Sequence, residues 1–267
     1  MLKIGAVIYD PKVTVIWDLI GKFFKEKGME IEAHFYKDYK MQVDALLAYE
    51  IDLAWNSPLA HLDSVLRGNE NFGYSLMRDT DQGRKTIMVA RKGEFSAPED
   101  LKGKVIGFGA LDSPQARLIP IKYLRDHGLE FGKDYEEKRF DIGLGLHGDH
   151  VGGELDAIKA LAKGEVDASF TLDLNWEAWK KDGTVDENAL EKIGETGTFD
   201  HCIFDYNDKV DKADVEKFEE IMLQMDYSKE DDKKIMDMEG LKEWRKGRLS
   251  GYDEITEANK YLNFLDV

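Results

Sequence analysis

The sequence has 267 residues, of which 42% are hydrophobic, 11% are aromatic and five are proline. This composition is typical of a globular chain with one large core or two smaller ones, and it excludes a disordered chain. The formal net charge of -17 opposes binding to nucleic acid or to an anionic membrane surface. No apolar run approaches the roughly 20 residues of a membrane span.

The first half of the chain alternates short apolar strands with helical stretches, which predicts a largely parallel sheet. Strands are expected at 2–8, 30–36 and 51–55, with helices at 11–27, 39–49 and 58–67. Further strands are expected at 72–78 and 86–91, followed by a helical turn at 98–101. The pattern then restarts, with strands at 104–109, 137–142 and 166–171 and helices at 114–127, 154–163 and 175–181. Such a restart indicates a second lobe.

The last quarter of the sequence is helical and charged. A strand at 199–205 precedes expected helices at 211–225, 229–237 and 253–264, and no further strand is expected. The simplest packing returns this tail to the first lobe. We therefore expect residues 1–85 with 200–267 to form lobe 1 and residues 86–199 to form lobe 2, with crossings near 84–92 and 195–205.

Three prolines follow a strand and a short polar residue and then open a helix: Asp10-Pro11, Ser57-Pro58 and Ser113-Pro114. Asp and Ser are good N-caps, and proline suits the first helical turn. In an open parallel sheet these junctions lie at the carboxyl ends of strands, where helix N-termini can bind an anion. Each polar residue either caps its own helix or also contacts a ligand. Ser57 and Ser113 are the better ligand residues, because Asp10 would repel an anion.

Residues 143–148 match the spacing G-x-G-x-x-G, but no apolar strand precedes the first glycine and no helix opens inside the motif. We interpret them as a mobile glycine-rich loop. His147 and His150 lack an identified third ligand, so they indicate local hydrogen bonding more than a metal site. The single cysteine, Cys202, is flanked by apolar residues and is expected to be a buried structural thiol.

Several segments together resemble the phosphate-, phosphite- and phosphonate-binding proteins of ABC importers, which have the type II periplasmic-binding-protein fold of the transferrin-like class. They are Phe35–Tyr39, followed by a helix and Ile51–Pro58, then residues 98–104 and residues 161–168. The similarity covers residues 2–180. It implies a two-lobed α/β protein with mixed, mostly parallel sheets and a ligand cleft between the lobes.

The resemblance also implies how a phosphoryl group is held: by an Asn-Ser-Thr-Ser-Gly turn that opens a helix, helped by tyrosines and a histidine. Tyr39 matches a family tyrosine. The turn here, residues 112–116, keeps only the first serine, Ser113. Glu154 stands where the family histidine aligns without a gap, and His150 takes that role only if the loop is longer. Arg84 stands where many members carry an aromatic residue.

These departures do not change the predicted fold, but they leave the identity of the ligand open. Arg84 and Arg117 are either surface charges or guanidinium groups for a carboxylate or phosphate. Asp10, Glu154 and Asp173 would suit the ammonium of a zwitterionic ligand.

We predict a solute-binding protein of an ABC importer that closes by hinge motion on a small anionic or zwitterionic ligand, such as a phosphonate, phosphate or related oxyanion. No catalytic residue, metal or cofactor is expected. The predicted ligand-binding residues are Tyr9, Tyr39, Asn56, Ser57, Arg84, Ser113, Gln115, His150 and Asp173. The expected partner is the transporter permease, and the chain itself is expected to be a monomer.

Residues 1–7 form a strand-like pattern without the charged, apolar and cleavage regions of a signal peptide. We expect a periplasmic or extracytoplasmic protein if a signal peptide was removed, and otherwise a cytoplasmic one. Two alternatives remain, because a fold does not fix a function. One is a cytoplasmic lyase or synthase on the same scaffold, of the menaquinone or thiamin-precursor type, and the other is a ligand sensor.

Overall fold

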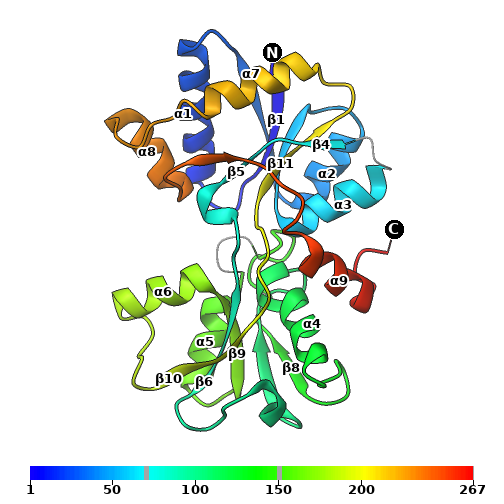
Figure 1. Ribbon diagram of the computed structural model, residues 1–267, viewed down its shortest axis with the longest axis vertical. Helices are drawn as coiled ribbons and strands as arrows, with labels where there is room; N and C mark the ends of the chain where they lie inside the picture. Colours follow the sequence, from blue (N-terminus) through cyan, green and yellow to red (C-terminus); the bar gives the residue numbers. More distant parts are fainter. Residues whose placement is uncertain (69–71, 149–151, 267) are drawn as a thin grey trace. The chain divides into compact units, whose positions relative to one another are not determined.

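The computed structural model describes residues 1–68, 72–148 and 152–266 and divides the chain into two compact units. Unit 1 comprises Met1–Gln82 and Asp200–Gly251, and unit 2 comprises Gly83–Phe199 and Tyr252–Asp266. In Figure 1 the colour order shows that unit 1 is built from the blue-to-cyan start of the chain and a later yellow-to-orange segment. Within the described ranges, no helix has the length and apolarity to cross a membrane.

Unit 1 contains a five-stranded sheet with the order β2-β1-β3-β11-β4. Its strands are β1 (Leu2–Val7), β2 (Ile31–Tyr36), β3 (Leu53–Asn56), β4 (Phe72–Tyr74) and β11 (Ile203–Asn207). Strand β1 pairs in parallel with β2 and β3, whereas β11 runs antiparallel to β3 and β4. The sheet is therefore mixed, because its fourth strand comes from the return of the chain from unit 2.

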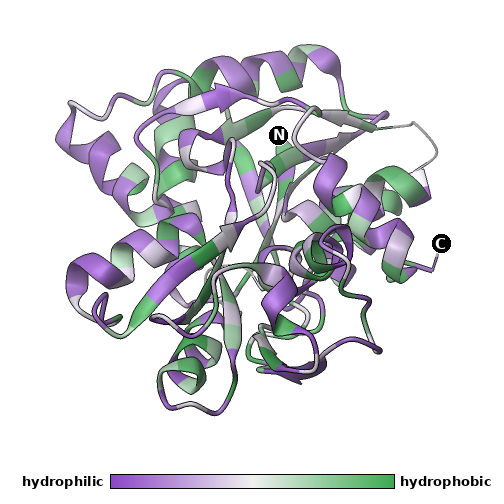
Figure 2. Cartoon of the chain, turned by 60° about the horizontal axis from the view of Figure 1, so that its bottom comes forward, coloured by the Kyte–Doolittle hydropathy of each residue, from purple (hydrophilic) through white to green (hydrophobic). Residues whose placement is uncertain are grey.

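Helices cover both faces of this sheet: α1 (Lys12–Glu26), α2 (Tyr39–Leu47), α3 (Pro58–Gly68), α7 (Lys212–Met222) and α8 (Glu230–Glu239). Apolar residues of α1, α7 and α8 pack with β1 and β11 in one core, which includes Phe24 stacked on Phe218 at 5.2 Å. Residues of α2 pack on the other face, around Leu46 and Ile51. Helices in Figure 2 alternate between hydrophilic and hydrophobic stretches, as expected when only one side of each is buried.

Unit 2 contains a second five-stranded sheet with the order β10-β6-β9-β7-β8. Its strands are β6 (Thr86–Arg91), β7 (Val105–Phe108), β8 (Glu136–Arg139), β9 (Ala168–Leu172) and β10 (Leu190–Glu195). Strand β7 is parallel to β8 and β9, and β6 is antiparallel to β9 and β10. Alternate residues of β6 enter different cores, with Met88 in one and Ile87 and Val89 in the other, as the two-residue period of a strand requires.

The helices of unit 2 are α4 (Ile119–Asp126), α5 (Glu154–Ala162), α6 (Asp173–Asp182) and α9 (Asp253–Leu262), with a short 3₁₀ turn η2 at Pro98–Leu101. The helix predicted at 114–127 begins as a π-helical segment, η3 (Pro114–Leu118), before it continues as α4. Strand β10 was not predicted; its sequence LEKIGE carries three charged residues and lacks apolar alternation.

Two features near the unit boundary differ from the sequence prediction. The strand predicted at 72–78 is split into β4 and β5 (Leu76–Arg78), because β4 pairs with β11 whereas β5 pairs with β12 (Trp244–Lys246). Strand β12 contradicts the expectation that no strand follows residue 205. It was missed because three residues are too short to show periodicity.

Helix α9 also contradicts the prediction, because it belongs to unit 2 and not to lobe 1. The structure packs it beside α4, where Lys122 and Glu254 form an ion pair at 3.2 Å (Figure 1). Tyr261 receives a hydrogen bond from the Phe131 amide at 3.3 Å, and the Arg125 guanidinium lies 4.7 Å from its ring centre. No local sequence pattern indicates these contacts, because Tyr261 is separated from Phe131 by 130 residues.

Candidate ligand-binding site

In unit 1, the predicted junction between β3 and α3 is a serine-capped helix start. The Ser57 hydroxyl accepts a hydrogen bond from the Ala60 amide at 3.2 Å, and the Ser57 carbonyl accepts one from the His61 amide at 2.8 Å. Proline follows at the first helical position. The N-terminal end of α3, with its partial positive charge, therefore begins directly beside Ser57.

Asn56, the neighbour of Ser57, lies at the centre of a buried polar network. Its side-chain oxygen accepts from the Gln42 amide at 2.8 Å, and its amide nitrogen donates to Ser64 at 3.2 Å and Asp205 at 2.8 Å. The other Asp205 oxygen lies 2.8 Å from His61 Nδ1. The structure thus uses both ends of the Asn56 amide inside unit 1, which fixes the turn that presents Ser57.

The remaining predicted residues of unit 1 lie at other helix starts. Tyr39 is the first residue of α2, which is capped by Asp38, and its side chain is buried. Tyr9 packs against the core with α1, and the Lys12 amine lies 5.9 Å from its ring centre. Asp10 accepts hydrogen bonds from the amides of Lys12 and Val13, through its side chain and carbonyl respectively, in the turn that leads into α1; the N-cap position itself is Pro11.

In unit 2, Ser113 caps η3, with its hydroxyl accepting from the Ala116 amide at 3.1 Å. Gln115 donates to the Gly148 carbonyl at 2.6 Å and to Glu154 at 3.1 Å. Gly148 has φ +61° and lies so close to Ser113 that a β-carbon there would be 2.1 Å from the serine hydroxyl. The end of the glycine-rich loop therefore packs directly on Ser113.

Asp112 holds the same loop through its carboxylate. One carboxylate oxygen accepts from the amides of Gly145 at 3.0 Å and His147 at 3.2 Å. Its other oxygen has no hydrogen-bond partner among the described residues. Burial raises the pKa of Asp112, although the amide hydrogen bonds lower it in part. Residues 143–148 form turns and open no helix, as expected of a loop that is not a dinucleotide-binding motif.

Glu154 is a fully buried carboxylate at the start of α5. One oxygen accepts hydrogen bonds from the Thr171 hydroxyl at 2.8 Å, the Leu172 amide at 2.8 Å and the Asn175 amide group at 3.0 Å. The other oxygen accepts from Gln115. Four donors from unit 2 itself therefore satisfy this side chain.

The charged residues predicted near the ligand have partners within unit 2. Arg84 Nη1 lies 3.5 Å from the Asp173 carboxylate, and burial raises the pKa of Asp173 while Arg84 opposes that rise. Arg117 donates to Glu137 at 2.6 Å and to the Leu111 carbonyl at 3.1 Å, which favours an internal role over a ligand contact. His147 Nε2 lies 3.8 Å from Asp112, and His150 lies outside the described residues.

Sequence reasoning missed the residues that hold the two serine turns in place. In unit 1 they include Gln42, His61 and Asp205, and in unit 2 Thr171 and Asn175. Their hydrogen-bond partners are distant in the sequence: Gln42 and Trp55 are 13 residues apart, and Asn56 and Asp205 are 149 residues apart. No local pattern signals such pairs.

The two-unit architecture with mixed sheets is that of a type II periplasmic-binding protein, as predicted. It superimposes with a TM-score of 0.75 on the structure of PhnD1 from Prochlorococcus marinus (MIT 9301) in complex with methylphosphonate, at 21% identity and covering 98% of each chain. That likeness confirms the fold class.

Sequence comparison then assigns the family. Residues 12–252 match the family described as ABC transporter, phosphonate, periplasmic substrate-binding protein, and the chain belongs to this family. It is 25% identical to a probable ABC transporter phosphite-binding protein, PhnD1, of Prochlorococcus marinus (strain MIT 9301), over 98% of this chain and 90% of that protein. It is 24% identical to the phosphate-import protein PhnD of Mycolicibacterium smegmatis, over 81% of this chain and 66% of that protein.

The family match confirms the predicted function at the level of class. The chain is a substrate-binding component of an ABC transporter. Members of this family are transport proteins and not enzymes, so the enzyme alternative is set aside.

Proposed function

We propose that this protein binds a phosphonate, phosphite or related phosphorus oxyanion and delivers it to the permease of an ABC importer. The observation that carries the proposal is the family match over residues 12–252, to which PhnD1 adds a relative crystallised with methylphosphonate. Such proteins act outside the cytoplasm, and we propose the same location and a monomeric state for this chain.

The serine-capped helix starts supply the chemistry. Ser57 opens α3 in unit 1, and Ser113 opens the η3–α4 segment in unit 2. A helix N-terminus presents backbone N–H groups and partial positive charge to an oxyanion, which compensates for the overall negative charge of the chain. We propose that both serines contact the ligand, with Tyr9 and Tyr39 beside Ser57, and with Arg84 and Asp173 near Ser113. We propose that Asn56 and Gln115 position these serines.

The carboxylates favour a simple anion over a zwitterion. A ligand ammonium would need an acidic partner, but the Asp10 carboxylate accepts from the Lys12 amide and Glu154 accepts four hydrogen bonds within unit 2. Asp173 pairs with Arg84. We therefore propose that an amino group on the ligand adds no affinity.

The test is the shift in melting temperature of the purified chain with methylphosphonate, 2-aminoethylphosphonate, phosphite, phosphate and sulfate. A phosphorus oxyanion at 100 times its dissociation constant stabilises the folded state by about 2.7 kcal/mol, which is readily detected. Absence of a shift with every phosphorus compound would refute the proposed ligand class. A much larger shift with the amino compound than with methylphosphonate would refute the preference for a simple anion.

Two variants test the serines separately. Ser57→Ala and Ser113→Ala should each abolish most of the ligand-induced shift, and should also lower stability by about 1 kcal/mol through the lost cap. The matched control is Asp211→Ala, which removes the cap of α7, where Asp211 accepts from the Ala213 amide at 2.9 Å. The control should lose similar stability and keep the full ligand shift; equal ligand shifts in all three variants would exclude the serines from the site.

A further inference from the structure

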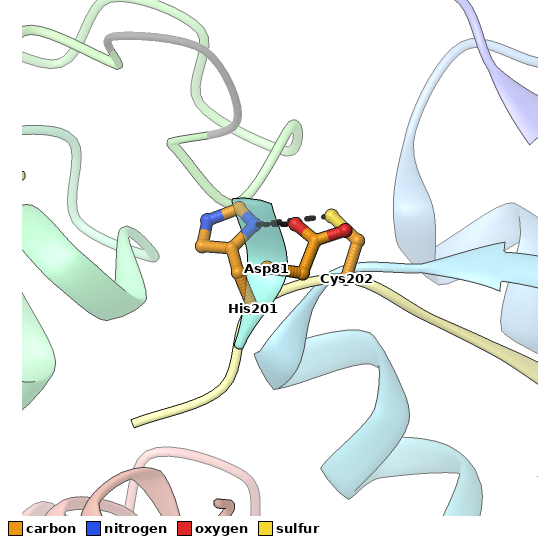
Figure 3. A group of neighbouring side chains, drawn as sticks. All are labelled: Asp81, His201 and Cys202. Carbon is orange, nitrogen blue, oxygen red and sulfur yellow. Dashed lines mark hydrogen bonds and ion pairs between the residues drawn. The ribbon is translucent and has the colours of Figure 1, made fainter. Parts of the chain in front are cut away.

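A group of three buried side chains lies in unit 1, apart from Ser57 and its network. Asp81 ends the short turn η1 (Asp79–Asp81), and His201 and Cys202 directly precede β11. Their exposed fractions are 1%, 5% and 0%. The His201 amide donates to the Asp81 carbonyl at 2.7 Å, which holds the two segments together, and Figure 3 shows the three side chains converging.

The donor atoms of these side chains are spaced as the ligands of one metal ion are. His201 Nδ1 lies 3.1 Å from Cys202 Sγ and 3.7 Å from Asp81 Oδ1, and the donor atoms all lie within 4.8 Å of one another. Tetrahedral zinc, with bonds of about 2.3 Å to sulfur and about 2.0–2.2 Å to nitrogen and oxygen, needs donor separations of about 3.4–3.6 Å. Shifts of a few tenths of an ångström in the contacts of His201 with Cys202 and with Asp81 would meet that geometry.

Hydrogen bonds from Arg78 orient the carboxylate of Asp81, and metal-binding carboxylates are usually oriented by such bonds. Arg78 donates from Nε to Oδ2 at 2.7 Å and from Nη2 to Oδ1 at 2.8 Å. Each carboxylate oxygen has two lone pairs, so Oδ1 can accept from Arg78 and still bind a metal. The guanidinium is itself fixed, with its centre 5.3 Å from the Trp55 ring.

The charges of the buried group also fit a divalent cation. Arg78 faces two carboxylates, Asp81 and Glu239, the latter at 3.6 Å from Nη1. An arginine guanidinium is not deprotonated in proteins, so Arg78 carries one positive charge. A divalent ion together with a Cys202 thiolate would make the buried set electrically neutral. Buried charges are stable when they are balanced in this way.

We propose that Asp81, His201 and Cys202 form a zinc-binding site, with water as the fourth ligand. Thiolate and imidazole donors select zinc over magnesium or calcium. Binding replaces the Cys202 thiol proton, which is released to solvent as the Zn–S bond forms. The site fastens the segment that leads into unit 2 at residue 83 to the segment that returns at residue 200. It does not depend on the identity of the transported ligand.

The experiment is a titration of the metal-stripped full-length chain with Co²⁺, followed by Zn²⁺. One equivalent of Co²⁺ should produce a thiolate-to-cobalt charge-transfer band, and Zn²⁺ should abolish it. Because the chain has a single cysteine, the band can be assigned to Cys202. No band, together with no stoichiometric zinc retained after dialysis, would overturn the proposal.

Variants identify the ligands. Cys202→Ser should abolish the band. His201→Gln should weaken Zn²⁺ binding by more than about 10-fold, because substitution of a residue that only supports a ligand already has an effect of that size. His34→Gln is the matched control, because His34 lies in the same unit beside Glu32 at 3.3 Å and should leave binding unchanged. Binding that persists in Cys202→Ser would refute the site.

A second measurement on the native chain guards against variants that fail to fold. Zn²⁺ should slow the reaction of Cys202 with a thiol reagent under mildly denaturing conditions, because a zinc-bound thiolate must dissociate before it reacts. An unchanged rate at saturating Zn²⁺ would count against the proposal.

Discussion

The buried carboxyl group of Glu154 is held by neutral hydrogen-bond donors alone. Its carboxylate receives hydrogen bonds from Thr171, Leu172, Asn175 and Gln115. Those donors come from β9, from the start of α6 and from η3, so the carboxylate ties three elements of unit 2 together. Its removal leaves several buried donors without a partner.

We predict that Glu154→Ala lowers the free energy of unfolding by at least about 3 kcal/mol, since each unsatisfied buried group costs about 1–3 kcal/mol. Urea denaturation monitored by tryptophan fluorescence, to which Trp176 and Trp179 of unit 2 contribute, measures this loss. Glu165→Ala, which removes an exposed partner of Lys138, should change stability by less than about 0.5 kcal/mol. Equal effects of the two substitutions would show that the network around Glu154 is not stabilising.

Asp112 gives a prediction about pH, because burial raises its pKa in the folded state. At pH values between 3.8, the ordinary pKa of an aspartate, and the raised pKa of Asp112, the folded state binds more protons than the unfolded state. Stability therefore falls as the pH rises through this range. Asp112→Asn keeps an oxygen that can accept from Gly145 and His147 and removes this penalty. The stability of the variant relative to the native chain should therefore increase as the pH rises from 3 to 7.

The control for this prediction has the opposite sign. A hydrogen bond from Arg139 lowers the pKa of Asp141, in the same region of unit 2. Asp141→Asn should therefore lose stability relative to the native chain as the pH rises over the same range. Thermal melts at a series of pH values measure both, and two slopes of the same sign would contradict the assignment.

Among the site residues, those that cap helices could be predicted, and those that support them could not. The Ser-Pro pattern identified Ser57 and Ser113, because an N-cap and a first-turn proline are local signals. Asn56 was predicted as a ligand residue, but its partner Asp205 lies 149 residues away and no local signal reveals it. The resemblance located Glu154 at the histidine position but could not show that Thr171 and Asn175 satisfy it.

At the scale of elements, the glycine-rich loop 143–148 is shaped by contacts at its end. Gly148 and Gly143 both have positive φ, +61° and +74°, so an alanine at either position is strained to a similar degree. They differ in their surroundings. An added β-carbon meets Ser113 at 2.1 Å at position 148, whereas the nearest atom at position 143 is 3.7 Å away.

We predict that Gly143→Ala costs only about 1–2 kcal/mol of backbone strain. Gly148→Ala should cost more, because the loop must also move off Ser113, and it should weaken the ligand-induced thermal shift. Thermal melts with and without methylphosphonate separate the two effects. If the two variants lose the same stability and show the same ligand-induced shift, the close contact between Gly148 and Ser113 does not contribute to ligand binding.

Most helices and strands were predicted within a few residues, because apolar periodicity and proline positions are local. Strand β3 and helix α3, for example, were expected at 51–55 and 58–67 and are found at Leu53–Asn56 and Pro58–Gly68. The failures have a common cause. Strands β10 and β12 are defined by their pairing with β6 and β5, and the break at Ser75 reflects two different partners for β4 and β5.

At the scale of the whole molecule, the C-terminal helix gives the clearest test of the division into units. Tyr261→Ala should increase amide hydrogen exchange in α4, because the Tyr261 ring lies against Arg125 of α4 and its hydroxyl accepts a hydrogen bond from the Phe131 amide just beyond α4. A loss of about 1–2 kcal/mol is expected for such a partly buried side chain. Hydrogen-exchange mass spectrometry locates the change.

The matched control is Tyr227→Ala in unit 1, whose ring lies 5.1 Å from the Lys233 amine of α8. It should affect exchange around α8 and leave α4 unchanged. If Tyr261→Ala instead loosened the helices of unit 1, the assignment of α9 to unit 2 would be wrong.

The interrupted path of the chain also sets the order in which the protein can be completed during synthesis. Strand β4 pairs with β11, and β5 pairs with β12, so both wait for residues that are made after the Gly83–Phe199 segment of unit 2 has been translated. At about 5–20 residues per second, the interval between β4 and β11 leaving the ribosome is roughly ten seconds. During that interval the edge of β3 that β11 later covers lacks its native partner, which makes the nascent first unit a natural client for chaperones.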